Sequence, residues 1–149
     1  MPADPIQPFP QVRRGDRVFP VRSLQQLLCA RNHDVAVDGI FGPRTESEVK
    51  AFQQEKGLAN DGVVGPATWS RLIVQVQRGS TGDAVRAVQE VIKFHDQSGG
   101  EAPPVHIDGI FGPRTDAFVR GFQTAVGTAS DGIVGPITWR ALVSGMLAG

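Results

Sequence analysis

The sequence predicts an all-α protein made of two tandem small three-helix bundles joined by Gly/Pro-rich turns, and repetition is the main evidence. The octapeptide DGIFGPRT occupies residues 38–45 and recurs letter for letter at residues 108–115. A weaker copy, DGxVGPxTW, follows each one at the same spacing, at residues 61–69 and 131–139. A fixed repeat period sets the number of structural units before any other consideration. Apolar residues at helical spacing around these motifs indicate that each unit is helical.

Three helices are expected in each repeat. The first follows from two apolar stripes: Val21, Leu24, Leu27 and Leu28, then Val85, Val88, Val91 and Ile92. For the second, Thr45 with Glu48 predicts a capping box, and Gly57 is the expected stop. Its twin runs from Thr115 to Gly127 with Phe118 in place of Glu48, so the reciprocal cap is lost there. The third begins at Pro66 or Pro136, where proline's missing N–H costs nothing, and buries Trp69 or Trp139.

The predicted organisation is a Pro-rich tail at residues 1–11 followed by repeats at 12–73 and 74–149. The register between the repeats changes before the second octapeptide. The extra residues fall near 96–104, a polar Gly/Pro-rich stretch that predicts a loop. The tail shows neither a basic nor an apolar signal region, which leaves any export route open.

Composition excludes several classes of function. Fifteen basic residues balance 15 acidic ones, and a net charge of zero argues against nucleic acid or an anionic membrane as the main partner. No stretch has the apolar length needed to span a bilayer. The single cysteine, Cys29, cannot build a disulfide framework or a metal site within one chain.

The four Asp-Gly pairs are interpreted as turns, because Asp accepts from nearby backbone N–H groups and Gly adopts positive φ. A calcium loop would need alternating oxygen ligands and a closing Glu, and none follow. We therefore expect no metal and no cofactor.

Taken in order, the motifs resemble the peptidoglycan-binding-like domain family. The matching segments of the first repeat are Arg14-Gly15, residues 21–25, the octapeptide, residues 49–53 and residues 61–69. The second repeat matches through Arg78-Gly79, residues 85–89, 108–115, 119–123 and 131–139, and departs only in Val88 for Leu. In the first repeat, residues 18–20 replace a polar Gly-containing stretch of the kind seen at residues 80–83. The resemblance implies a three-helix module that attaches proteins to the bacterial cell wall, and hence a cell-wall or extracellular location.

Arg44 and Arg114 are the preferred ligand-binding residues. Each is expected beside the N-terminus of its second helix, where free N–H groups and the helix dipole favour an anion. Stem peptides of peptidoglycan carry carboxylates, which a guanidinium binds with two parallel hydrogen bonds. Thr45 and Thr115 are candidates for additional hydroxyl contacts. The alternative is that both Arg side chains are solvated surface groups.

Gln53 and Gln123, with Gln25 and Gln89, are candidates of a second kind. Their helical faces predict burial, and a buried amide that bonds to the Asp-Gly turns is favoured over one that contacts ligand. Trp69 and Trp139 are likewise expected in the core, as are Phe41 and Phe111, although an indole edge that lines a groove is the alternative.

Catalysis is not expected. His33, His95 and His106 have no equivalents across the repeats, and no nucleophile–base or zinc-protease motif is present. The predicted function is non-catalytic binding of peptidoglycan by two tandem modules, with a separate wall hydrolase as a further candidate partner. The alternative is a protein–protein or spacer module of a phage or secretion-type assembly, since fold does not fix function.

Overall fold

The computed structural model describes residues 8–17, 19–95 and 106–144. These residues form six helices and isolated β-bridges without a β-strand: α1 (Val21–Ala30), α2 (Pro43–Glu55), α3 (Pro66–Leu72), α4 (Asp83–His95), α5 (Pro113–Val126) and α6 (Pro136–Ser144). The all-α class and the three helices of each repeat are thus confirmed. The predicted loop at 96–104, residues 1–7 of the predicted tail, Val18 and the side chain of His95 lie outside the described part of the chain.

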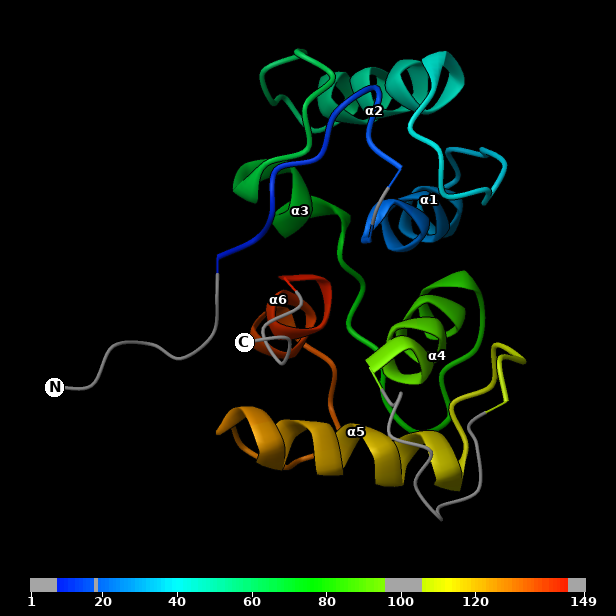
Figure 1. The fold of residues 1–149 in the computed structure, drawn as a ribbon, viewed down its shortest axis with the longest axis vertical. Helices are drawn as coiled ribbons and strands as arrows, with labels where there is room; N and C mark the ends of the chain where they lie inside the picture. The colour runs from blue at the N-terminus through cyan, green and yellow to red at the C-terminus, as the bar shows by residue number, and fades with distance from the viewer. Residues whose placement is uncertain (1–7, 18, 96–105, 145–149) are drawn as a thin grey trace, which may run out of the picture.

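The six helices lie in layers (Figure 1). Helices α2 and α5 are at opposite ends, and the other four lie between them, with α1 packed against α4. The first helices of the two repeats therefore make the main contact between the repeats. The guanidinium of Arg22 adds a bidentate pair across this contact, donating to the two carboxylate oxygens of Glu90 at 3.0 and 2.7 Å. The guanidinium of Arg31 donates to the carbonyls of Leu72 (3.0 Å) and Ile73, which fixes the end of α3.

The apolar residues predicted for the core are buried and form one cluster that includes both repeats. Trp69 and Trp139 are fully buried, as are the octapeptide residues Phe41 and Phe111. A shared core is economical for units of this size, because a small domain buries proportionally little of its surface on its own.

In each repeat, a β-bridge joins the segment before the first helix to the segment before the third helix. Val12 pairs with Val64 through two hydrogen bonds of 3.0 and 2.8 Å, and Val76 pairs with Val134 in the same way. The indole N–H of Trp69 donates to the carbonyl of Pro10 at 2.7 Å, while that of Trp139 donates to Val74 at 2.7 Å. The connecting residues Val74 and Val76 are therefore bonded into the second repeat.

The end of the predicted tail packs against the first repeat. Phe9 stacks on Trp69 with ring centroids 5.9 Å apart and an interplanar angle of 10°. Together with the Pro10 carbonyl, this contact shows that residues just upstream of Val12 belong to the packed structure.

The predicted capping box at Thr45 is wrong. Helix α2 begins at Pro43 with Gly42 as its N-cap, and no side chain caps it. Proline at the first position has a suitable φ and no N–H to satisfy, so the helix begins three residues earlier than a cap at Thr45 would place it. The hydroxyl of Thr45 instead accepts a hydrogen bond from Gln25 at 3.1 Å. Helix α5 begins in the same way at Pro113 and ends, as predicted, at Gly127 with φ of 81°.

Candidate functional site

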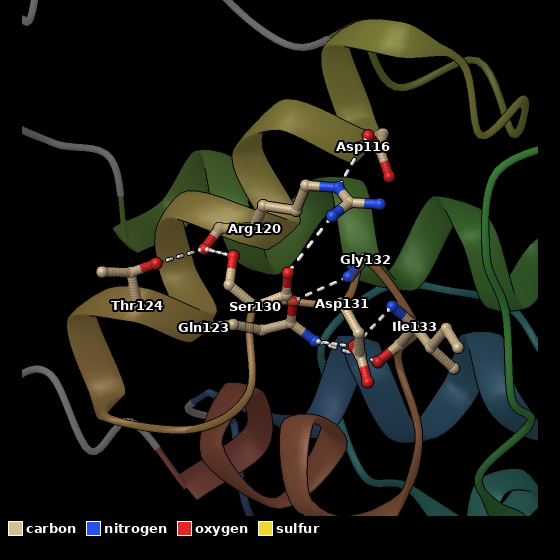
Figure 2. A network of polar contacts seen from close by, with 8 residues as sticks. All are labelled: Asp116, Arg120, Gln123, Thr124, Ser130, Asp131, Gly132 and Ile133. Atoms are coloured by element: carbon tan, nitrogen blue, oxygen red, sulfur yellow. Dashed lines mark hydrogen bonds and ion pairs between the residues drawn. The ribbon is translucent and has the colours of Figure 1, made fainter.

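A buried glutamine braces each Asp-Gly turn, and Figure 2 shows the example at Gln123. Its amide nitrogen donates to Oδ1 of Asp131 (3.1 Å), the carbonyl of Ile133 (3.0 Å) and the hydroxyl of Thr138 (3.1 Å). Its amide oxygen accepts from the backbone N–H of Gly132 at 3.0 Å. One amide therefore ties together a helix, a turn and the first turn of the next helix.

The same arrangement occurs at the other three glutamines. Gln25 braces the turn at Asp38 and bonds Thr45, Gln89 braces the turn at Asp108 and bonds Thr115, and Gln53 braces the turn at Asp61 and bonds Thr68. The predicted structural role of these glutamines is confirmed. The brace also explains why each motif keeps Thr where it does, since the Thr hydroxyl is a buried acceptor.

A basic side chain three residues before each glutamine covers the outside of the turn, which the sequence analysis missed. Nη1 of Arg22 donates to the carbonyl of Val37 at 2.9 Å, and Nη1 of Arg120 donates to that of Ser130 at 3.2 Å. The only sequence signal is the repeated Arg/Lys-x-x-Gln spacing at residues 22, 50, 86 and 120.

Six of the eight predicted ligand contacts are consequently buried and hydrogen-bonded inside the protein. They are Thr45, Thr115, Gln53, Gln123, Trp69 and Trp139. The contacts of the Gln and Trp side chains are those expected for a structural role, whereas the hydroxyls of Thr45 and Thr115 accept from buried glutamines instead of capping a helix. Of the eight predicted ligand contacts, Arg44 and Arg114 are therefore the two that a ligand can reach at the surface.

Arg44 is exposed but engaged. Its Nε lies 3.3 Å from Oε2 of Glu48 one turn along α2, and its Nη2 donates to the carbonyl of Asp34 at 3.2 Å. Glu48 also contacts the ring of His33, with 3.3 Å between Oε1 and Nδ1. The other ring nitrogen of His33 lies 3.1 Å from a carboxylate oxygen of Glu55, and this hydrogen bond lowers the pKa of Glu55.

Arg114 lies instead at an open groove of about 360 Å³. The groove is lined by residues from α4, the second octapeptide and the segment before it: Gln89, His106, Asp108, Ile110, Gly112, Pro113, Arg114 and Thr115. Arg114 and His106 are exposed, and neither has a hydrogen bond or ion pair to a described residue. His106 is not among the ligand-binding residues predicted from the sequence.

Asp108, which also lines this groove, is held in its turn by hydrogen bonds. Its Oδ1 accepts from the N–H of Ile110 at 2.9 Å and from the amide of Gln89 at 3.1 Å. The backbone hydrogen bond from Ile110 has the largest effect and lowers the pKa of Asp108. The hydrogen bond from Gln89 and the charge of His106 lower it further. Asp38 has the same two kinds of partner in the first repeat and a lowered pKa for the same reasons.

Within the residues that the structure describes, no group of three or more His, Cys, Asp or Glu side chains is arranged to hold a metal ion. The same residues include no helix that is long and apolar enough to cross a membrane. The fold and the repeated motifs define a duplicated helical module.

Residues 20–72 and 81–142 match the peptidoglycan binding domain family, and the chain belongs to this family with two tandem copies. The chain is 41% identical over 78 residues to a zinc D-Ala-D-Ala carboxypeptidase of Streptomyces albus G. The matched region covers 52% of this chain and 28% of the relative. The chain is 30% identical over 166 residues to the N-acetylmuramoyl-L-alanine amidase CwlM of Mycobacterium tuberculosis, covering 95% of this chain and 39% of the relative. The chain thus spans less than half the length of either enzyme.

Among solved structures, the chain is similar to the N-terminal domain of SleB. The TM-score is 0.43 at 31% sequence identity, over 50% of this chain and 94% of that one.

Proposed function

We propose that this chain is a non-catalytic peptidoglycan-binding unit that holds itself, and any wall hydrolase associated with it, at the bacterial cell wall. The observation that carries the proposal is that two tandem segments of the chain, residues 20–72 and 81–142, match a peptidoglycan-binding family. The enzymatic relatives are longer than this chain, which fits a division between binding repeats and separate catalytic domains.

The described residues supply little for hydrolysis of the wall. His33, the most enclosed of the described histidines, lies between Glu48 and Glu55, and neither ring nitrogen contacts a nucleophile. A general base must reach the nucleophile or water from which it takes a proton, whereas both ring nitrogens of His33 lie against glutamate side chains.

A spacer or protein–protein module is the second candidate, and the contact between α1 and α4 favours it. The shared core and the pair between Arg22 and Glu90 join the repeats into one body, which suits a rigid scaffold. Binding to the wall is therefore best tested on the whole chain, because separated repeats would expose apolar core surface.

Co-sedimentation with purified insoluble sacculi tests the proposal. We expect saturable pelleting with sacculi, none with chitin or cellulose, and competition by soluble muropeptides. Absence of saturable pelleting across several wall chemistries would leave the spacer function in its place. Release of amino groups or reducing ends from sacculi incubated with the protein would contradict the non-catalytic assignment.

A further inference from the structure

The two octapeptides are identical in sequence, yet the surfaces around their arginines differ. Outside the octapeptides, Glu48 of the first repeat corresponds to Phe118 of the second, and Ala36 corresponds to His106. Glu48 pairs with the guanidinium of Arg44, and His106 lines the same groove as Arg114. The comparison therefore isolates what each neighbourhood adds to the same motif.

In the first repeat, the protein itself supplies the anion. The carboxylate of Glu48 lies 3.3 Å from Nε of Arg44, and the carbonyl of Asp34 accepts from Nη2 at 3.2 Å. The contact with His33 holds Glu48 in place from the other side. An incoming carboxylate would have to displace Glu48 and would then stand beside its charge.

In the second repeat, this internal anion is missing. Phe118 packs partly buried against the core, so it leaves Arg114 without a carboxylate one turn along the helix. The nearby acidic residue Asp116 is paired with Arg120, with 3.0 Å between Oδ2 and Nε. His106 adds a second basic side chain to the lining of the groove.

From this asymmetry, we infer that the second repeat alone carries an open carboxylate-binding site, formed by Arg114 and His106, whereas Glu48 blocks the equivalent site of the first repeat. The inference rests on the proposed function and specifies where in the chain the wall is bound.

The lining of the groove indicates the chemistry of the ligand. Ile110 is 57% exposed and lies with Pro113 beside Arg114, so the groove joins an apolar surface to a cation. A carboxylate next to a small apolar side chain matches both parts, and the C-terminal D-Ala of a stem peptide has this chemistry. Asp108 does not distinguish the repeats, because Asp38 occupies the same turn in the first.

The size of the effect follows from the exposure of these groups. An exposed ion pair on a helix is worth about 0.3–1 kcal/mol. An internal carboxylate at this position should therefore weaken binding by about two- to five-fold, since 1.4 kcal/mol corresponds to a factor of ten. Removing the guanidinium itself should cost more, because charge-assisted bonds to the ligand are then lost.

Five proteins test the inference: the natural chain, Arg114→Ala, Arg44→Ala, Phe118→Glu and Phe118→Gln. The last two remove the same ring and differ only in charge, so they separate the electrostatic effect from any effect on folding. Two readouts are used: pelleting with sacculi, and NMR titration with N-acetyl-D-Ala-D-Ala and its C-terminal amide. Arg114→Ala should weaken binding at least five-fold and Arg44→Ala less than two-fold. Phe118→Glu should bind two- to five-fold more weakly than Phe118→Gln, and the amide more weakly than the free acid.

The two readouts distinguish the failure of this inference from that of the proposed function. Equal losses in Arg44→Ala and Arg114→Ala, or equal binding of Phe118→Glu and Phe118→Gln, would overturn the inference even if the natural chain pellets. Pelleting with no preference for the free carboxylate would overturn it as well. Carboxylate binding that depends on Arg114 without pelleting would keep the site and refute the wall function.

Discussion

Replacing Gln53 with Leu removes one of the four glutamine braces while it preserves the approximate volume of the side chain. The amide of Gln53 donates to Asp61 (3.1 Å), to the carbonyl of Val63 (2.9 Å) and to Thr68 (3.0 Å), and it accepts from Gly62 (2.9 Å). Leu can make none of these bonds.

The magnitude follows from which partners are buried. The N–H of Gly62 and the hydroxyl of Thr68 lie in buried residues and would lose a partner without gaining water, at about 1–3 kcal/mol each. Asp61 is exposed and Val63 only partly buried, so water can replace the amide there. After a partial offset from the more apolar side chain, the free energy of unfolding should fall by about 2–5 kcal/mol.

Urea unfolding followed by circular dichroism measures this loss, and the adjacent, exposed Gln54 provides the control. With a slope of about 2 kcal/mol/M, the midpoint of Gln53→Leu should drop by about 1–2.5 M urea. Gln54→Leu should stay within about 0.5 kcal/mol of the natural protein. A loss below about 1 kcal/mol for Gln53→Leu, or equal losses in the two variants, would refute the reasoning that the brace stabilises the fold.

Three further predictions concern the turns and the contact between repeats. Gly121→Ala in the exposed middle of α5 should raise the free energy of unfolding by about 0.5–1 kcal/mol, whereas Gly132→Ala should lower it by about 1–2 kcal/mol because Gly132 has φ of +76°. Hydrogen bonds to the carboxylate lower the pKa of Asp108 in the folded protein. Its stabilising contribution is therefore present above the unfolded pKa of about 3.9 and is lost as pH falls through the folded pKa. Asp108→Asn should remove this contribution and so flatten the fall in stability between about pH 5 and pH 2. The coupling between Arg22 and Glu90, measured by a double-mutant cycle of Ala variants, should be about 0.3–1 kcal/mol and should shrink in 1 M NaCl.

Each of these predictions has a clear contradictory result in chemical denaturation. Equal effects of Ala at Gly121 and Gly132 would show that backbone conformation does not control the turn. An unchanged acid limb in Asp108→Asn would show that its carboxylate is not linked to folding. Salt-independent coupling between Arg22 and Glu90 would mean that packing, not charge, joins them.

Periodicity and turn chemistry were sufficient to predict the helices, because each repeat buries a regular apolar stripe. The start of α2 is predicted wrongly because two local rules compete: Thr45 with Glu48 fits a capping box, whereas Pro43 fits the first position of a helix. Only the position of Gln25 in space shows that the hydroxyl of Thr45 is a buried acceptor. Such a contact joins residues far apart in the chain and has no local signature. The same is true of Arg22 and Glu90, whose pairing depends on how the repeats pack.

The two arginines of the candidate site cannot be distinguished from local sequence either. Arg44 and Arg114 lie in identical octapeptides, so local sequence predicts the same role for both. In the structure, Glu48 pairs with Arg44, whereas His106 lines the same groove as Arg114. Both neighbours lie outside the octapeptides, so the octapeptide sequence alone does not distinguish the two arginines.

An NMR titration of the isotopically labelled chain with a soluble muropeptide that carries free stem-peptide carboxylates tests whether the second repeat alone binds the wall. We expect saturable shifts of the amide resonances of residues 106–115, with residues 36–45 nearly unchanged. Equal shifts in both segments, or shifts confined to residues 36–45, would show that binding is not restricted to the second repeat.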